Sequence, residues 1–243
     1  MGGVRVSMYR PTTSGFSWAQ PALGFASMNT IHELQRRASP APKPQSLAWD
    51  GSVLWMGSLE QRRIYAINPA TWTVGWETAT PGVPWGMTAV DRELRVLCSE
   101  TADSSRTIWR CVPGAGFDAQ FLYPCPDDMG SQLGYDGRRL HLSQWYPRKV
   151  LMLDAGGQVE RTMNIPHGIC GQVIVEGFIY LVTTDAEETT DYWLTRVDPG
   201  PATPVIDDLV RIPFAARALA FDGRNFWTNH RAENQIVSFA RPD

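Results

Sequence analysis

Long apolar runs and an excess of charge are both missing from this sequence. Its 243 residues contain no stretch of about 18 apolar residues, the length that a membrane-spanning helix requires. Residues 1–10 lack the basic start and the continuous apolar stretch of a secretory signal peptide. The net charge is only -3, and the Lys and Arg residues are scattered rather than clustered. We therefore expect a cytoplasmic monomer, with neither a membrane nor nucleic acid among its partners.

Motifs for metal binding and for common catalytic chemistry are also missing. The four cysteines, Cys98, Cys111, Cys125 and Cys170, show no C-x-x-C spacing. There is no G-x-S-x-G elbow, no phosphate-binding glycine loop and no H-E-x-x-H motif. We predict reduced thiols, as is usual in the cytoplasm. A disulfide between Cys98 and Cys111 is the alternative, because these residues fall on neighbouring predicted strands.

What the sequence does contain is one phrase that recurs five times, an apolar strand followed by an acidic residue and a turn. The acidic residues are Asp50, Asp91, Asp136, Glu176 and Asp222, and they are 41, 45, 40 and 46 positions apart. A repeat of this length in a β-rich sequence is typical of a propeller with one four-stranded blade per repeat. The pattern therefore predicts the architecture, whereas the activity depends on residues outside the pattern.

The repeat that begins near residue 45 shows how one blade is encoded. Apolar strands are predicted at 46–49, 53–56, 64–67 and 72–78, separated by an Asp-Gly turn, a polar connection and an Asn-Pro turn. The later repeats follow the same order. We predict an all-β, five-bladed β-propeller with four antiparallel strands per blade, as one domain over residues 1–243. The repeats are expected to start near residues 45, 86, 131, 171 and 217.

The last repeat ends before a fourth strand, because only four residues follow the strand predicted at 236–239. The segment 28–38 precedes the first repeat at the place where a fourth strand would stand. We predict that this N-terminal strand pairs with the last blade and closes the ring, which removes two exposed sheet edges. Residues 1–27 are then an N-terminal extension.

Propeller geometry assigns each loop to one of two faces. The repeated acidic residues lie on one face, where an Asp at a turn hydrogen-bonds its own backbone, so we interpret them as turn residues. The opposite face carries the crossings between blades and the connections from second to third strands; we call it the crossing face. Loop variation concentrates there, which favours this face for function. Its candidate ligand-binding residues are Trp85, Asp128, Gln132, Gln144, Trp145, Cys170, Gln172 and Arg217.

Two histidines are candidates for catalysis. His167 and His230 lie in predicted loops of the crossing face, and an imidazole titrates near neutral pH, which suits a general acid or base. With a loop carboxylate either residue is also a candidate metal ligand. No cofactor is predicted from the sequence, and a divalent metal in the channel stays an alternative. His32 and His141 fall on predicted strands and are interpreted as structural.

Segments 46–57 and 63–71 resemble the repeats of glutaminyl-cyclotransferase-like propellers. The crossings 84–87 and 166–169 resemble those of streptogramin-lyase-like propellers. The first resemblance implies the fold; the characteristic segments that carry cyclotransferase activity are absent, so no catalytic residue is transferred from that family. The second resemblance implies lyase chemistry with His167 as the channel-face imidazole.

These observations lead to one functional hypothesis and two alternatives. We expect the mouth of the central channel on the crossing face to bind a small molecule or a short peptide. The first alternative is a lyase, hydrolase or cyclase that acts on a small molecule with a histidine of the same face. The second is a scaffold whose rim binds another protein.

Overall fold

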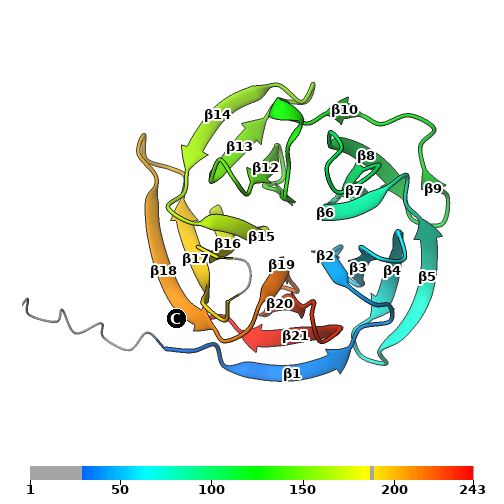
Figure 1. Cartoon of the computed structure of the whole chain (residues 1–243), viewed down its shortest axis with the longest axis horizontal. Helices are drawn as coiled ribbons and strands as arrows, with labels where there is room; N and C mark the ends of the chain where they lie inside the picture. Colours follow the sequence, from blue (N-terminus) through cyan, green and yellow to red (C-terminus); the bar gives the residue numbers. More distant parts are fainter. Residues whose placement is uncertain (1–28, 187–188, 243) are drawn as a thin grey trace, which may run out of the picture.

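The computed structural model describes residues 29–186 and 189–242. Over these ranges the chain forms five antiparallel sheets arranged in a ring around a central axis, so the predicted five-bladed β-propeller is confirmed (Figure 1). The 3-10 turn η1 (Pro126–Asp128) interrupts the succession of strands. Within the described ranges no helix has the length and apolar character needed to cross a membrane. The predicted extension 1–27 lies outside the described residues.

Three sheets consist of four consecutive strands that follow the order of the chain from the axis outward. The strands of blade 1 are β2 (Pro44–Trp49), β3 (Leu54–Ser58), β4 (Arg63–Asn68) and β5 (Thr73–Ala79). Those of blade 3 are β11 (Gln132–Tyr135), β12 (Leu140–Gln144), β13 (Lys149–Leu153) and β14 (Val159–Asn164). Those of blade 4 are β15 (Gly168–Val175), β16 (Phe178–Thr184), β17 (Tyr192–Asp198) and β18 (Val205–Ile212).

Blade 2 departs from this pattern at its outer edge. It contains β6 (Val83–Val90), β7 (Glu93–Ser99), β8 (Thr107–Val112), β9 (Gly116–Phe117) and β10 (Tyr123–Pro124). Both two-residue strands pair with β8, so together they occupy the place of a fourth strand. The intervening sequence, with glycines at 114 and 116 and a proline at 124, does not sustain a continuous strand.

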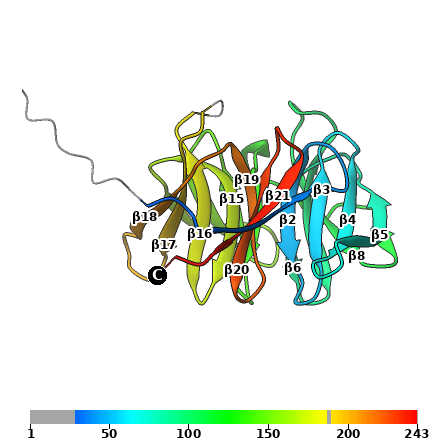
Figure 2. The same cartoon turned by 90° about the horizontal axis from the view of Figure 1, so that it is seen from below.

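The N-terminal strand closes the ring, as predicted. Blade 5 consists of β19 (Ala216–Phe221), β20 (Asn225–His230), β21 (Gln235–Ala240) and, outermost, β1 (Glu33–Ala38). β1 runs antiparallel to β21 along its whole length (Figure 1). Just before β1, Thr30 also forms a parallel bridge to Arg211 of blade 4, so this segment connects two blades. Figure 2 shows β1 crossing the side of the ring beside β21.

All five repeated acidic residues lie in turns, and three of them hydrogen-bond the turn backbone as predicted. In blades 1, 3 and 5, Asp50, Asp136 and Asp222 each accept hydrogen bonds from the backbone N–H groups two and three residues later. In blades 2 and 4 the turn has two residues, and Asp91 and Glu176 adopt the left-handed conformation with φ of 56° and 53°. The same phrase therefore encodes two turn geometries.

The apolar core is divided among the spaces between neighbouring blades. Each of five clusters combines side chains from two adjacent sheets; the cluster between blades 1 and 2, for example, includes Trp55 and Val96. Near the axis the backbones themselves come close together. A Cβ atom at Gly86 would lie 2.7 Å from Cα of Gln132, so glycine allows the innermost strands of blades 2 and 3 to approach.

All four cysteines are free and buried. Cys98 and Cys111 do lie on the neighbouring strands β7 and β8, but Cys98 is opposite Thr107, while Cys111 is opposite Leu94. Burial raises the pKa of Cys111 and that of Cys125 to about 12, which keeps both thiols protonated. The alternative of a disulfide is therefore not realised in this structure.

Candidate functional site

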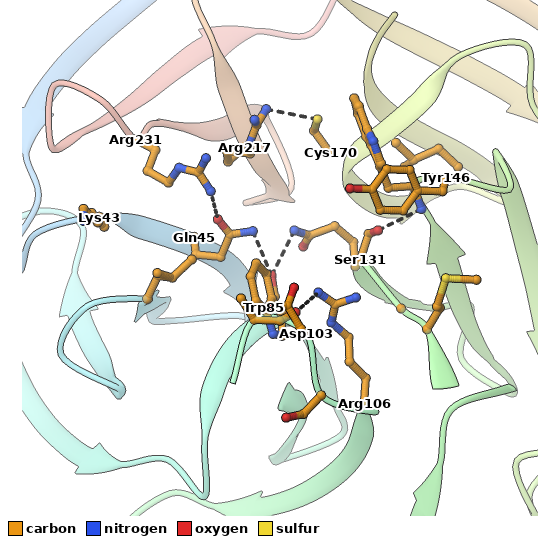
Figure 3. A pocket seen from close by; sticks show the side chains of 18 of the residues that line it. Lys43, Gln45, Trp85, Asp103, Arg106, Ser131, Tyr146, Cys170, Arg217 and Arg231 are labelled. Atoms are coloured by element: carbon orange, nitrogen blue, oxygen red, sulfur yellow. Dashed lines mark hydrogen bonds between the residues drawn. The ribbon is translucent and has the colours of Figure 1, made fainter. Parts of the chain in front are cut away.

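The crossing face holds a cavity of ≈ 850 Å³ at the mouth of the central channel. Its wall includes residues from all five blades: Gln45 from blade 1, Trp85 from blade 2, Gln132 from blade 3, Cys170 from blade 4 and Arg217 from blade 5. The loops between second and third strands form its rim, as Tyr146 does in blade 3 (Figure 3). A site built in this way depends on the closed ring, because no single blade contains it.

Irregularities in the innermost strands aim side chains into this cavity. The pairing register shifts at Gln45 in β2, at Trp85 in β6 and at Cys170 in β15, so each is an extra residue opposite its partner strand. A bulge turns a side chain away from the alternation of the strand. In β19 the register shift follows Arg217, and there Ala218 has a left-handed φ of 58°. Four blades thus present a polar or aromatic side chain to the channel mouth.

A chain of hydrogen bonds joins these side chains across the floor of the cavity (Figure 3). Arg231 donates from Nη1 to Oε1 of Gln45 at 2.7 Å. The amide groups of Gln45 and Gln132 both donate from Nε2 to the carbonyl oxygen of Trp85, at 3.4 and 3.1 Å. The carbonyl of Trp85 is therefore the point at which blades 1, 2 and 3 meet. This arrangement orients both amides and leaves the cavity floor polar.

Trp85 and Arg106 form a stacked pair in the wall of the cavity. The guanidinium carbon of Arg106 lies 4.4 Å from the centroid of the Trp85 ring, while the indole Nε1 of Trp85 donates to Oγ of Ser99 at 2.7 Å. Nη2 of Arg106 donates only a long hydrogen bond of 3.5 Å to the carbonyl of Ala102, and its Nε is buried without a partner among the described residues. Burial lowers the pKa of Arg106, although the group stays a cation at neutral pH.

A third part of the wall consists of Trp145 and Tyr146, between β12 and β13. The backbone N–H of Trp145 donates to Oγ of Ser131 at 2.9 Å. The Trp145 ring packs on the backbone of Gly168, where a Cβ atom would lie 2.6 Å from the ring. Tyr146 is 83% exposed at the rim. Blade 3 therefore supplies a flat aromatic surface opposite the polar floor.

Arg217 is held on the side of blades 4 and 5. Its Nη1 donates to the hydroxyl of Tyr192 at 2.7 Å, to Sγ of Cys170 at 3.1 Å and to the carbonyl of Ala216 at 3.2 Å. The described lining contains the basic residues Lys43, Arg106, Arg217 and Arg231 and the acidic residues Glu60, Asp103 and Asp128. Lys43 and Glu60 form an ion pair of 3.3 Å at the rim. The cavity therefore combines aromatic surface with charges of both signs.

Six of the candidate ligand-binding residues line this cavity: Trp85, Asp128, Gln132, Trp145, Cys170 and Arg217. Gln144 and Gln172 do not. Gln144 is fully buried and donates to the carbonyls of Pro126 and Met129, so it supports the crossing that contains η1. Gln172 donates to the carbonyl of His141 at 3.0 Å and lines a small cavity of ≈ 140 Å³ at the other end of the channel.

Neither candidate catalytic histidine lines the cavity. His167 is drawn toward the outer strands of blade 4, where its ring nitrogens face Asp185 and Asp208 at 3.1 and 3.3 Å and its ring packs on Trp193. His230 lies against Phe214, with Nδ1 3.2 Å from Nη1 of Arg36. The two imidazoles therefore have structural partners that hold them away from the channel mouth. The cavity as described therefore does not include either histidine that the sequence analysis proposed for catalysis.

Sequence reasoning missed several polar residues of the cavity, among them Gln45, Arg106, Ser131 and Arg231. The strand predicted for the first repeat begins at residue 46, and the bulge at Gln45 lies just before it, where the sequence carries no signal for one. The loop that contains Arg106 differs in sequence from the corresponding loops of the other repeats. The repeat pattern therefore could not predict where the Arg106 side chain points. No group of three or more His, Cys, Asp or Glu residues able to hold a metal ion occurs over residues 29–186 and 189–242.

The sequence matches no protein-family model and no curated protein sequence. Solved propeller structures do resemble it. A glutaminyl cyclase from Myxococcus xanthus matches with a TM-score of 0.65 and 13% identity, over 88% of this chain and 99% of that chain. A PQQ-bound aldose sugar dehydrogenase from Streptomyces coelicolor matches with a TM-score of 0.53 and 12% identity, over 87% and 98% of the two chains. A calcium-binding regucalcin from Agrobacterium tumefaciens matches with a TM-score of 0.53 and 10% identity, over 87% and 95%.

At these identities the likeness concerns the fold alone. It confirms, at the level of the fold, the resemblance to glutaminyl-cyclotransferase-like propellers that the repeats indicated. This chain, a five-bladed propeller, thus resembles in fold the propellers of several proteins with different activities.

Proposed function

We propose that the protein binds a small molecule, or one end of a short peptide, in the crossing-face cavity, and that the bound group carries a carboxylate. The observation that supports binding is the size and construction of the cavity, ≈ 850 Å³ with walls from five blades. Small-molecule sites are typically concave spaces of roughly 300–1,000 Å³ with a few oriented polar groups. The hydrogen-bonded floor of Gln45 and Gln132 supplies such groups.

Arg106 is the reason to expect a carboxylate. A guanidinium has five N–H donors, and a planar carboxylate accepts two of them side by side. Among the described residues, the guanidinium of Arg106 has one hydrogen-bond acceptor, the carbonyl of Ala102, at the long distance of 3.5 Å. The stack on Trp85 holds the guanidinium plane in place, so less freedom is lost when a ligand binds. Hydrogen bonds to a bound carboxylate would also replace the hydrogen bonds to water that Arg106 loses by its burial.

The other walls suggest the rest of the ligand. Trp145 offers an apolar face, because its ring packs on Gly168 while Ser131 holds its backbone N–H. The amide of Gln132, which donates to the Trp85 carbonyl and lines the same cavity, can hydrogen-bond a polar substituent. A carboxylic acid with a flat or apolar body, or the C-terminus of a peptide with such a side chain, fits this combination.

A screen of small carboxylic acids and short peptides against the full chain tests the proposal, with ligand-detected NMR for binding and thermal shift for stabilisation. Arg106→Gln should weaken the ligands found by about tenfold, because one charge-assisted hydrogen-bonded pair is lost. Arg106→Lys should restore the charge but little of the affinity, since a single ammonium cannot form the paired contact.

The matched control is Arg224→Gln, which removes the same charge from an exposed turn on the opposite face. This variant should bind as the wild type does. Ligands whose affinity is equal in wild type and Arg106→Gln, or a screen in which carboxylic acids bind no better than their amides, would contradict the proposal.

A further inference from the structure

A second cavity, of ≈ 390 Å³, opens on the face opposite the first, between blades 3 and 4. One wall comes from β12 and β13 and includes His141 and Met152; the other comes from β15 and β16 and includes Ile174 and Ile179. At its outer end Arg161 spans the two blades, donating to the carbonyls of Pro199, Pro201 and Ala202. The surface of the site is therefore mainly apolar, and the guanidinium of Arg161 is engaged by backbone carbonyls; Asp136 and the exposed Arg138 complete the charged part of the lining.

The internal repeat explains why a cavity exists here. His141 stands five residues after the turn carboxylate Asp136, at the position that Trp55 holds in blade 1 and Trp227 in blade 5. Both indoles donate from Nε1 to Oδ2 of their turn carboxylates, Asp50 and Asp222, at 2.7 Å. In blade 3, Nε2 of His141 lies 3.0 Å from Oδ2 of Asp136 and takes over this hydrogen bond.

The histidine reproduces the hydrogen bond of the indole but lacks its second ring. In blade 1 the Trp55 ring packs edge-to-face on Trp76 of β5 at 5.7 Å, and the Trp227 ring of blade 5 stacks at 6.0 Å on Trp72, which belongs to the neighbouring blade 1. In blade 3, the residues paired across neighbouring strands at this position are His141, Met152 and Arg161. The volume that aromatic rings fill in blades 1 and 5 is therefore partly empty in blade 3.

His141, one of the residues that line this cavity, also has an unmet hydrogen-bonding requirement. Burial opposes the ionisation of Asp136, but hydrogen bonds from His141, Arg139 and Arg138 outweigh it and lower the pKa of this carboxyl. A carboxylate only accepts, so Nε2 of His141 carries the proton and Nδ1 is left as an acceptor. Burial lowers the pKa of His141, which keeps the ring neutral. Nδ1 is buried and has no partner among the described residues.

We propose that this second cavity binds a small, neutral, planar aromatic molecule that carries an N–H or O–H group, of about the size of indole. The aromatic body packs between Met152 and the isoleucines Ile174 and Ile179, as aromatic rings do between blades 1 and 2. The donor group pairs with Nδ1 of His141. The ligand thus fills the space that the second indole ring occupies in blades 1 and 5. It also provides a hydrogen-bond donor for Nδ1 of His141.

Indole itself is the probe for the test, titrated into the wild-type full chain with isotope-labelled methionine methyl groups. Met152 lines the second cavity and Met129 the first, so their NMR signals report on the two sites separately. Indole should shift the signal of Met152 and leave that of Met129 in place. N-methylindole, which has the same shape but no donor, should bind about tenfold more weakly.

His141→Trp is the decisive variant, because it restores the residue of blades 1 and 5 and fills the cavity with a covalent indole. This variant should lose indole binding. If it does not fold, the Met152 and Met129 signals of the wild type still decide. The proposal fails if indole at about 5 mM, enough to detect a millimolar dissociation constant, leaves Met152 unshifted. It also fails if N-methylindole binds equally well, or if His141→Trp folds and still binds indole.

Discussion

At the scale of single residues, one type of side chain serves two different purposes in the repeated turns. Asp50 accepts hydrogen bonds from two backbone N–H groups of its turn and from the Trp55 indole. Asp91 stands at the same place in the sequence phrase, but its own backbone is left-handed with φ of 56°. The carboxylate matters in the first turn, whereas the ability to adopt positive φ matters in the second.

We therefore expect the same substitution to have different effects at the two positions. Asp50→Asn should lower the free energy of unfolding by about 1–3 kcal/mol, because an amide cannot accept the indole and the turn hydrogen bonds together. Asp91→Asn should change it by less than about 0.5 kcal/mol, since Asn tolerates positive φ well. Urea unfolding of both variants measures the difference, and equal losses would contradict the assignment of roles.

At the scale of elements, the contact between β1 and blade 5 contains a titratable group. His230 accepts a hydrogen bond at Nδ1 from Arg36 of β1, at 3.2 Å, and Arg36 also donates to Gln235 at 2.8 Å. Burial, followed by the charge of Arg36, lowers the pKa of His230. Glu33 and Glu233 act in the opposite direction and do not reverse the shift. The neutral imidazole is therefore the form that the folded state prefers.

The sign of the resulting pH dependence follows from linkage. Because the folded pKa of His230 lies below its unfolded value, its contribution to stability is present above the unfolded pKa of about 6.5 and is lost as the pH falls through the folded pKa. His230→Gln keeps an acceptor for Arg36 but does not titrate. Urea unfolding at about pH 7.5 and pH 5 should show a smaller loss of stability in this variant than in the wild type. Equal losses in the two proteins would show that the contact does not titrate.

At the scale of the whole molecule, the ring depends on a strand from the opposite end of the chain. β1 completes blade 5, and its approach segment bridges to Arg211 of blade 4. Without β1, the outer edge of β21 would expose unpaired backbone groups, which promote association between molecules. The crossing-face cavity uses residues of all five blades, so its shape depends on the same closure.

Deletion of residues 1–38 should therefore reduce stability and cause aggregation. A synthetic peptide of residues 29–40, which contains all of β1, should restore the monomer when it is added in excess. Size-exclusion chromatography and thermal unfolding with and without the peptide provide the measurement. A truncated chain that remains monomeric and as stable as the full chain would refute the role of β1 in closure.

The sequence by itself determined the fold, because the signals for it are local. The turn carboxylates, the glycines that follow them and the alternating strands act over a few residues, and their recurrence set the number of blades. The sequence also predicted the position of the closing strand. The last repeat lacks a fourth strand, and the N-terminal segment contains one strand more than the first repeat needs, so the extra strand can complete the last blade. The same assignment of loops to faces predicted five residues that line the cavity: Trp85, Gln132, Trp145, Cys170 and Arg217.

Only the tertiary structure decided which side chains reach the channel. The bulge in β2 turns Gln45 into the cavity, and it forms against the partner strand rather than within the local sequence. His167 and His230 are drawn outward by Asp208 of a different strand and by Arg36 of a distant one. The second cavity depends on the packing of blade 3 against blade 4 beside His141. Local chemistry acts between near neighbours in the chain, whereas these placements depend on contacts between remote segments.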